Sequence, residues 1–196
     1  MTDTKTGYHH GDLRAALIDA GLQLTRAGGP EALTIREATR RVGVSPNAAY
    51  RHFADREALL RAVATTIQHR MTARMRNSVR RRGSIELLRA VGIGYIKFAL
   101  DEPGWFAVAF FGVGHSDDTA SAPPYLALVE ALDAMVEAGV LSPERREGAE
   151  WPCFSAVHGF AELALHGPLR GMSRRQVESL AGRTVDDIIA GLRLRA

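Results

Sequence analysis

Apolar residues recur every three or four positions along most of this 196-residue chain, which is the pattern of amphipathic α-helices. The first such stripe begins near Asp12 and ends at the Gly28-Gly29-Pro30 sequence. Its apolar positions are Leu13, Leu17, Ala20 and Leu24. No segment shows a convincing strand pattern, so the sequence predicts an all-α fold.

The next stretch has the sequence features of a helix-turn-helix. Thr34 and Glu37 form a capping box that begins one helix. Gly43 suits the left-handed turn that ends this helix. Ser45 is a favourable N-cap for a second helix, and Pro46 fits its first position. The same pattern would also suit a helical hairpin inside an ordinary bundle, so side-chain chemistry has to distinguish the two.

Further helices are predicted along the rest of the chain. Asp55 can cap a long helix that runs from Arg56 to about Arg82 and is strongly basic toward its end. Later helices are expected over residues 84–101, 105–113, 125–138 and 142–166, and from Ser173 onward. We therefore expect a helix-turn-helix domain over residues 1–56, a linking helix over about 56–82, and a second helical domain over 83–196.

The charge is distributed unevenly between the two parts. Residues 1–82 hold 15 Lys and Arg against 7 Asp and Glu, whereas residues 83–196 hold 10 against 15. A basic first part joined to an acidic remainder suggests a polyanion partner for the first part only. A run of cations at the end of the long helix is also favoured by the helix dipole, without any DNA contact.

The sequence composition indicates the cellular compartment of the protein. Cys153 is the only cysteine, so no internal disulfide is expected and an oxidising compartment is not implied. The N-terminal sequence has no apolar core of a signal peptide. The longest uncharged run, residues 103–116, is too short to span a bilayer and contains three glycines. We expect a cytoplasmic protein with no membrane partner.

The second helix of the helix-turn-helix carries side chains that suit DNA. Asn47, Tyr50, Arg51 and His52 can all reach phosphates or base edges. Asn pairs well with adenine and Arg with guanine in the major groove. Arg56 lies at a helix start, where backbone N–H groups already favour an anion, and is expected to clamp a phosphate.

The segment from Thr34 to Val63 closely resembles the N-terminal DNA-binding domain of the tetracycline-repressor (TetR) family. The matched positions are Thr34 and Ile35, Gly43-Val44-Ser45, Tyr50-Arg51-His52-Phe53, Arg56, and Leu59-Leu60. The chain departs from the family pattern at Thr39 and at Ala48-Ala49. Ala48 lacks a hydroxyl for DNA contact, although its methyl group can meet a thymine methyl.

This resemblance implies a role for each matched residue. Thr34 and Tyr50 would donate to phosphates, and His52 would touch the DNA backbone. Arg36 and Arg41 are plausible extra phosphate contacts. The residues closest to the base edges would be Pro46, Asn47 and Arg51, and Ser45 and Ala48 are also expected to contact DNA. The implied function is a homodimeric transcriptional regulator on a near-palindromic operator, a repressor released by a small-molecule effector.

The second half resembles the TetR subfamily named for a Trp-His-Gly signature, with Trp151, His158 and Gly159 as the matching residues. In the family the last two long helices form the dimer interface. An effector cavity would be lined by aromatic residues, namely Tyr95, Phe98, Trp105, Phe106, Phe110, Phe111 and Phe154, together with His158. The alternative for each of these side chains is plain core packing.

A second function class rests on His158, Glu162 and His166, which are spaced four apart and would share one helix face. His115, Asp117 and Asp118 could add metal ligands from a loop. Such a set would suit a metal-binding or catalytic helical bundle. The chain has no His-Glu-x-x-His sequence and no evident nucleophile–base pair, so we expect neither an enzyme nor a cofactor.

Overall fold

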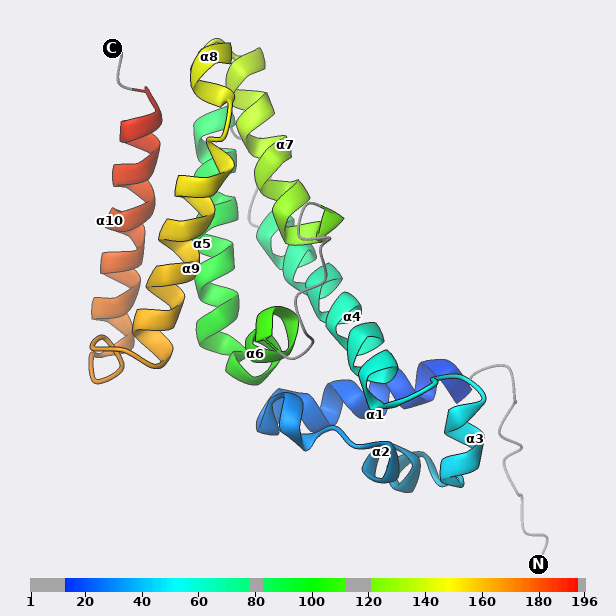
Figure 1. Ribbon diagram of the computed structural model, residues 1–196. Helices are drawn as coiled ribbons and strands as arrows, with labels where there is room; N and C mark the ends of the chain where they lie inside the picture. Colours follow the sequence, from blue (N-terminus) through cyan, green and yellow to red (C-terminus); the bar gives the residue numbers. More distant parts are fainter. Residues whose placement is uncertain (1–12, 78–82, 112–120, 194–196) are drawn as a thin grey trace, which may run out of the picture.

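The computed structural model describes residues 13–77, 83–111 and 121–193, and within these ranges every regular element is helical (Figure 1). The elements are α1 (Leu13–Gly28), the short 3-10 helix η1 (Pro30–Ala32), α2 (Ile35–Val42), α3 (Pro46–Tyr50), α4 (Arg56–Asn77), α5 (Ser84–Asp101), α6 (Pro103–Phe111), α7 (Pro123–Glu137), α8 (Pro143–Arg146), α9 (Glu150–Leu165) and α10 (Arg174–Arg193). The predicted all-α fold is confirmed. None of the helices in the described ranges is long and apolar enough to cross a membrane.

Two predicted helices differ from the observed ones. The helix expected over residues 142–166 is two helices, because Glu147 leaves the helical region with ψ 120° and Gly148 has a positive φ of 68°. The second helix of the helix-turn-helix was expected to reach His52, but it ends at Tyr50. There the N–H groups of His52 and Phe53 both donate to Ala49 O, which tightens the turn. The predicted end of the long helix, residues 78–82, lies outside the described residues.

Helix α4 joins the two parts of the molecule. Figure 1 shows α1, α2 and α3 grouped at its N-terminal end, and α5, α6 and α7 pack along the rest of it. Leu59 and Val63 are fully buried near that N-terminal end, where α4 contacts α1. Met71 and Met75 are buried further along, where α4 contacts α5, α6 and α7. One hydrophobic core therefore runs along α4 through both parts of the molecule, and a tilt of α4 would affect both.

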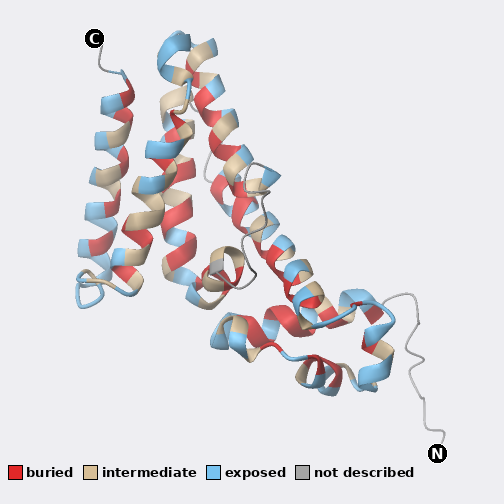
Figure 2. Cartoon of the chain, viewed as in Figure 1, coloured by how far each residue is buried: buried red, intermediate tan, exposed pale blue. Residues whose placement is uncertain are grey.

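Helices α5 to α10 form the C-terminal bundle, with α5 at its centre. Helix α5 contacts α4, α7, α9 and α10, and it buries apolar side chains on several sides. Figure 2 shows the buried residues on the inward faces of these helices and exposed residues on the outside of α10. Arg89 of α5 forms an ion pair with Asp186 of α10 at 2.7 Å, and this pair joins the two helices at the edge of the core. The buried residues of the bundle are continuous with those around α1–α3.

Candidate DNA-binding surface and effector pocket

The turn between α2 and α3 has the geometry that the sequence predicted. The Thr34 hydroxyl accepts a hydrogen bond from the Glu37 N–H at 3.1 Å, which caps α2. Gly43 ends that helix in the left-handed region with φ 78°, and its N–H donates to Thr39 O. Pro46 stands at the first turn of α3 after Ser45. The capping box is only half formed, because the Glu37 carboxylate binds the Arg40 guanidinium instead of the Thr34 N–H.

Helix α3 separates core residues from exposed ones within a few positions. Ala49 is fully buried and Phe53 is 4% exposed, so these two side chains fix the helix against the core. The Tyr50 side chain lies between them in sequence yet is 53% exposed. A large aromatic residue held at the surface of a short helix suits contact with a macromolecule better than packing.

The other predicted DNA contacts lie on the same exposed surface. We define the reading surface as the side chains that the resemblance assigns to DNA and that the structure exposes, which are Thr34, Arg36, Ser45, Pro46, Asn47, Tyr50, Arg51 and His52. Ala48 is half-buried at its edge. Exposure leaves these side chains free to meet DNA, and each individual DNA contact stays a prediction.

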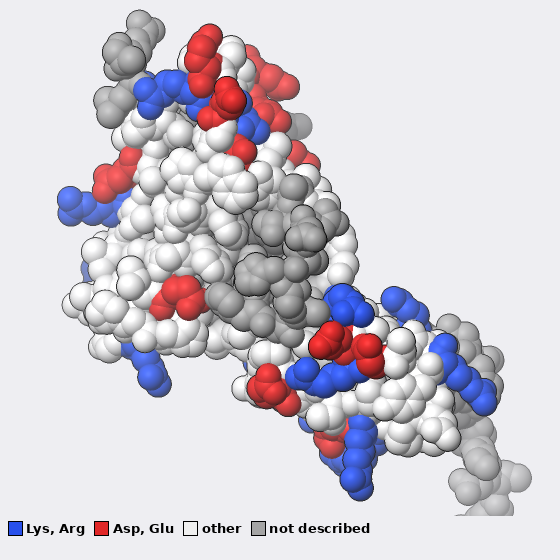
Figure 3. Space-filling model, viewed as in Figure 1, with Lys and Arg blue, Asp and Glu red and all other residues white. Residues whose placement is uncertain are grey.

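The charges at the reading surface leave cations available for phosphates. Arg40 forms a bidentate pair with Glu37, and Arg41 lies 3.6 Å from the same carboxylate. Within the described ranges, no carboxylate lies within ion-pair distance of Arg36 or Arg51. Figure 3 shows basic side chains projecting from the α1–α3 end of the molecule, with acidic residues between them. Arg36 and Arg51 are therefore the cations of this surface that are best placed to meet DNA.

Arg56 has a different contact from the one predicted. Its Nε and one terminal nitrogen donate to the carbonyl oxygens of Leu33 and Pro30, both at 2.6 Å. The guanidinium thus holds the η1 turn and the start of α2 against α4. Because these nitrogens are occupied by main-chain oxygens, Arg56 positions Thr34 at the surface, and the direct phosphate clamp has less geometric support.

A narrow apolar slot lies inside the C-terminal bundle, between α4, α5, α7, α9 and α10. About 30 Å³ of it is open to the centre of a water molecule, so its lining atoms nearly fill it. Its lining residues are Met75, Leu88, Val91, Gly92, Tyr95, Pro124, Leu128, Cys153, Phe154, Ala156, Val157, Val185, Ile188 and Ile189. Two predicted effector-pocket residues, Tyr95 and Phe154, are among them.

An aromatic cluster adjoins the slot at Tyr95. The Tyr95 ring lies 5.8 Å from Phe106, 5.6 Å from Phe110 and 5.9 Å from Phe154. The His158 ring stacks on Phe154 at 5.3 Å and also contacts Phe106 and Phe110. Four further predicted pocket residues therefore lie together with Tyr95 of α5. They are Phe106 and Phe110 of α6, and Phe154 and His158 of α9. The side chain of Phe111 is outside the described set.

Tyr95 and His158 form the polar centre of this cluster, with their Oη and Nδ1 atoms 2.8 Å apart. Desolvation by burial, with the nearby charge of Glu162 added, raises the pKa of the Tyr95 hydroxyl well above its usual range. Burial lowers the pKa of His158, although Glu162 opposes this. Both shifts favour the neutral groups near pH 7, and the tautomer of His158 decides which of the two atoms donates.

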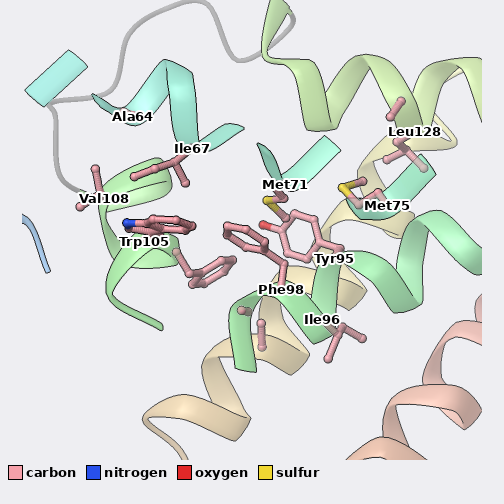
Figure 4. Packing of buried hydrophobic residues seen from close by; sticks show 14 of the residues in the cluster. Ala64, Ile67, Met71, Met75, Tyr95, Ile96, Phe98, Trp105, Val108 and Leu128 are labelled. Carbon is pink, nitrogen blue, oxygen red and sulfur yellow. The ribbon is translucent and has the colours of Figure 1, made fainter. Parts of the chain in front are cut away.

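Trp105 is not part of the pocket, contrary to the sequence prediction. Its Nε1–H donates to Leu22 O of α1 at 2.8 Å, and its ring lies between the guanidinium groups of Arg26 and Arg70. Figure 4 shows Trp105 beside Ile67 and Val108, at the end of the hydrophobic cluster away from Tyr95. Phe98 is buried under Arg74 and does not line the slot either. Both residues serve the packing between helices.

Helix α6 meets the C-terminal end of α1 in a close contact that the sequence did not reveal. Glu102 is 3% exposed, and its carboxylate accepts two hydrogen bonds from Arg26 at 2.7 Å and one from Arg74 at 3.2 Å. Gly104 lies so close to α1 that a Cβ atom there would overlap the carbonyl oxygens of Thr25 and Arg26. We call this contact the α1–α6 junction, formed by Arg26, Arg74, Glu102, Gly104 and Trp105. It links the aromatic cluster directly to the domain that carries the reading surface.

The junction should make stability depend on acid pH. Hydrogen bonds and charge from Arg26 and Arg74 lower the pKa of the Glu102 carboxyl. Its stabilisation is therefore complete above the ordinary carboxyl pKa of about 4.3 and is lost as the pH falls through the lowered folded-state pKa. Glu102→Gln should cost about 1–3 kcal/mol at pH 7 and should flatten the fall in unfolding free energy below pH 5. Urea denaturation across pH would measure this, and an unchanged acid slope would contradict it.

Cys153 offers a chemical probe of the slot, because it lines the slot and burial raises the pKa of its thiol to about 11. At that pKa only about 0.1% of the thiol is thiolate at pH 8, against roughly a quarter for a free cysteine. We expect a disulfide reagent such as dithiodipyridine to label the folded protein more than 100-fold more slowly than the urea-unfolded protein. Rapid labelling of the folded protein would show that the slot is open to water.

The alternative metal or catalytic site has no support in the described residues. His158 Nδ1 is bonded to Tyr95, and His166 is an exposed residue at the end of α9. No group of three His, Cys, Asp or Glu side chains in the described ranges could hold a metal ion. His115, Asp117 and Asp118 lie outside those ranges.

A helix-turn-helix domain that shares a long helix with a pocket-bearing bundle defines a ligand-responsive class of transcriptional regulator. Residues 17–63 match the family model described as bacterial regulatory proteins, tetR family, and residues 88–188 match that of the tetracyclin repressor-like C-terminal domain. The chain belongs to the TetR family, and it is a DNA-binding transcriptional regulator, not an enzyme.

Individual relatives agree with this assignment. The chain is 22% identical to the HTH-type transcriptional regulator YobS of Bacillus subtilis (strain 168) over 147 residues, which cover 75% of this chain and 76% of that protein. A protein of unknown function from Rhodococcus sp. RHA1 has a similar structure, with a TM-score of 0.79 and 27% identity over 97% of this chain and all of that one. A TetR variant from Acinetobacter baumannii AYE, solved in complex with minocycline, gives a TM-score of 0.66 and 20% identity over 92% of this chain and 98% of that one.

Proposed function

We propose that this regulator is a cytoplasmic, homodimeric repressor that leaves its operator when a small molecule enters the C-terminal bundle. The observation that carries this proposal is the α1–α6 junction. Phe106 and Phe110 of α6 contact Tyr95 beside the slot, while Gly104 and Trp105 of the same helix contact α1. A ligand that displaces α6 therefore acts directly on the helix behind the reading surface.

Different side chains of the reading surface would contact the phosphates and the base edges of the DNA. The Thr34 hydroxyl uses its lone pair to cap α2, so its proton remains to donate to a phosphate. Tyr50 would donate to a second phosphate, and Asn47 and Arg51 would contact base edges. Two such surfaces related by a dimer axis would read half-sites about one helical turn apart in a near-palindrome.

The last two helices offer a surface for the dimer. Trp151 and Leu163 of α9 are 56% and 47% exposed, and Leu180 of α10 is 36% exposed. Large exposed apolar side chains on neighbouring helices are typical of protein–protein contact. Trp151, with His158 and Gly159, would also place the chain in the Trp-His-Gly subfamily. We further propose that residues 1–56 form the DNA-binding domain and residues 83–196 form the second domain.

The ligand has to distinguish two states of the dimer. To move the equilibrium from almost entirely DNA-competent to almost entirely released, it must favour the released state by about 5.5 kcal/mol. The minocycline complex of the Acinetobacter protein supports a small organic molecule as the effector here as well. In this chain the narrow slot would have to widen to accept it, and that widening would act on α4 and α6.

The test is a gel shift of the full-length protein on DNA upstream of its own gene, together with selection from fragmented genomic DNA. We expect a near-palindromic sequence to be enriched and bound with an affinity that falls steeply as salt rises. Failure to enrich any sequence, in both experiments, would contradict the proposed function.

A further inference from the structure

We propose that the effector is an amphiphilic amine, a protonated nitrogen on a slender apolar chain, and that Glu162 is the residue that selects it. The inference rests on the proposed effector pocket and adds the chemical class of its ligand. It follows from three observations: the apolar lining of the slot, the position of Glu162 further along α9, and a buried oxygen atom of Glu162 that has no hydrogen-bond partner among the described residues.

The lining of the slot suits the apolar part of such a molecule, for which the slot would have to widen. Nearly all of its lining surface is carbon, and the Tyr95 hydroxyl and the Cys153 thiol are the polar groups among its lining side chains. Its narrow cross-section favours an unbranched chain over a broad ring system. Transfer of each CH₂ group from water into such a site contributes about 0.8 kcal/mol, so a chain of several carbons supplies most of the binding free energy.

Helix α9 connects the slot to Glu162. Phe154, His158 and Glu162 follow one another at four-residue spacing and so lie along one face of this helix. Phe154 lines the slot, and His158 stacks on it within the aromatic cluster. The charge of Glu162 acts on both Tyr95 and His158. A molecule whose chain fills the slot would therefore direct its other end past Tyr95 toward Glu162.

One oxygen atom of the Glu162 carboxylate lacks the hydrogen bond that a buried acceptor needs. Its Oε1 atom is buried, and no donor among the described residues reaches it. The Tyr95 hydroxyl in the adjoining cluster is already hydrogen-bonded to His158 Nδ1. A buried acceptor without a partner costs about 1–3 kcal/mol, and more when the group is charged. An ammonium group would remove this penalty and neutralise the charge, whereas a ligand carboxylate would be repelled.

The aromatic cluster around His158, one helical turn before Glu162 on α9, favours the same head group. Phe106 is 1% exposed and Phe110 is half-buried, and their centroids lie 4.9 Å apart beside His158. Aromatic faces attract cations by about 0.5–2 kcal/mol when water is excluded. Aromatic rings together with a carboxylate one helical turn further along α9 thus favour a cation that also carries N–H donors.

Four ten-carbon probes that differ only in their head groups test the proposal. These are decylamine, decyltrimethylammonium, decanol and decanoate, each titrated into the full-length dimer by calorimetry below its micelle concentration. We expect decylamine to bind best, decyltrimethylammonium and decanol more weakly, and decanoate at least tenfold more weakly than decylamine. Glu162→Gln should reduce the affinity for decylamine about tenfold or more and change that for decanol less than threefold. Glu162→Asp, which keeps the charge, should retain part of the preference.

Glu147→Gln is the matched control, because Glu147 is exposed and lies outside both the slot and the cluster. It should leave all four affinities unchanged. Decanoate binding as tightly as decylamine, no binding of any probe, or full decylamine affinity in Glu162→Gln would each overturn the proposal. A gel shift on the same preparation keeps the two hypotheses apart. Operator binding with no preference for the amine overturns only the ligand class, and amine preference without DNA binding overturns only the regulatory function.

Discussion

Tyr50→Ala is expected to reduce operator affinity by about 100-fold or more while leaving the free energy of unfolding nearly unchanged. The side chain is 53% exposed, so its removal leaves no cavity in the core formed around Ala49 and Phe53. A hydrogen bond to a charged phosphate contributes about 1.5–3 kcal/mol, and a dimer would lose one at each half-site. Fluorescence anisotropy with operator DNA would measure the loss of affinity, and urea denaturation would measure stability.

Two companion variants separate the contributions at this position. Tyr50→Phe keeps the ring and removes only the hydroxyl, so it should retain stability but lose a large part of the affinity. Leu126→Ala removes a comparably exposed apolar side chain on α7, away from α3, and should leave DNA binding unchanged. Full operator affinity in Tyr50→Ala would remove Tyr50 from the reading surface.

Gly104→Ala is expected to lower the free energy of unfolding by about 2–4 kcal/mol and to weaken the response to effector. A Cβ atom at this position would overlap the carbonyl oxygens of Thr25 and Arg26, and main-chain atoms cannot move aside as a flexible side chain can. Helix α6 must therefore shift away from α1, which strains the Glu102–Arg26 pair and the Trp105–Leu22 hydrogen bond. Urea denaturation measures the first effect, and ligand-induced release of DNA measures the second.

Gly191→Ala is the matched control for this helical glycine, because a Cβ atom there would meet nothing within 4 Å. It should be neutral or stabilise the protein by up to about 1 kcal/mol, as alanine does in helices. If Gly104→Ala matched Gly191→Ala in stability and in effector response, the α1–α6 junction would not be the link between pocket and DNA-binding domain.

The sequence predicted the local features of this fold well, because caps and turns act over a few residues. Thr34, Gly43 and Pro46 each stand where their chemistry suggested, at the ends of α2 and the start of α3. The break at Gly148 was missed although residues 144–150 are almost entirely polar, because no apolar pattern there marks where α8 ends and α9 begins, and the local backbone conformation separates the two helices.

Contacts between distant segments were harder to predict. Arg26 and Glu102 are separated by 76 residues, and nothing in either segment indicates the partner. Trp105 was grouped with Phe106 and Phe110 as one aromatic run, but adjacent helical residues point about 100° apart. The i, i+4 pair Phe106 and Phe110 contacts Tyr95, while Trp105 contacts α1. Helical geometry alone could have separated these residues, whereas the identity of each neighbour required the fold.

The two tryptophans of this chain should give distinct optical signals. Trp105 is 6% exposed and lies between Arg26 and Arg70, whereas Trp151 is 56% exposed. Iodide should therefore leave the emission of Trp105 almost untouched, and the extent to which it quenches Trp151 would measure how far the partner subunit covers that side chain. In a Trp151→Phe variant the remaining fluorescence would come from the indole between α1 and α6 alone, so a shift in its emission on adding effector would report the rate at which the two domains move apart.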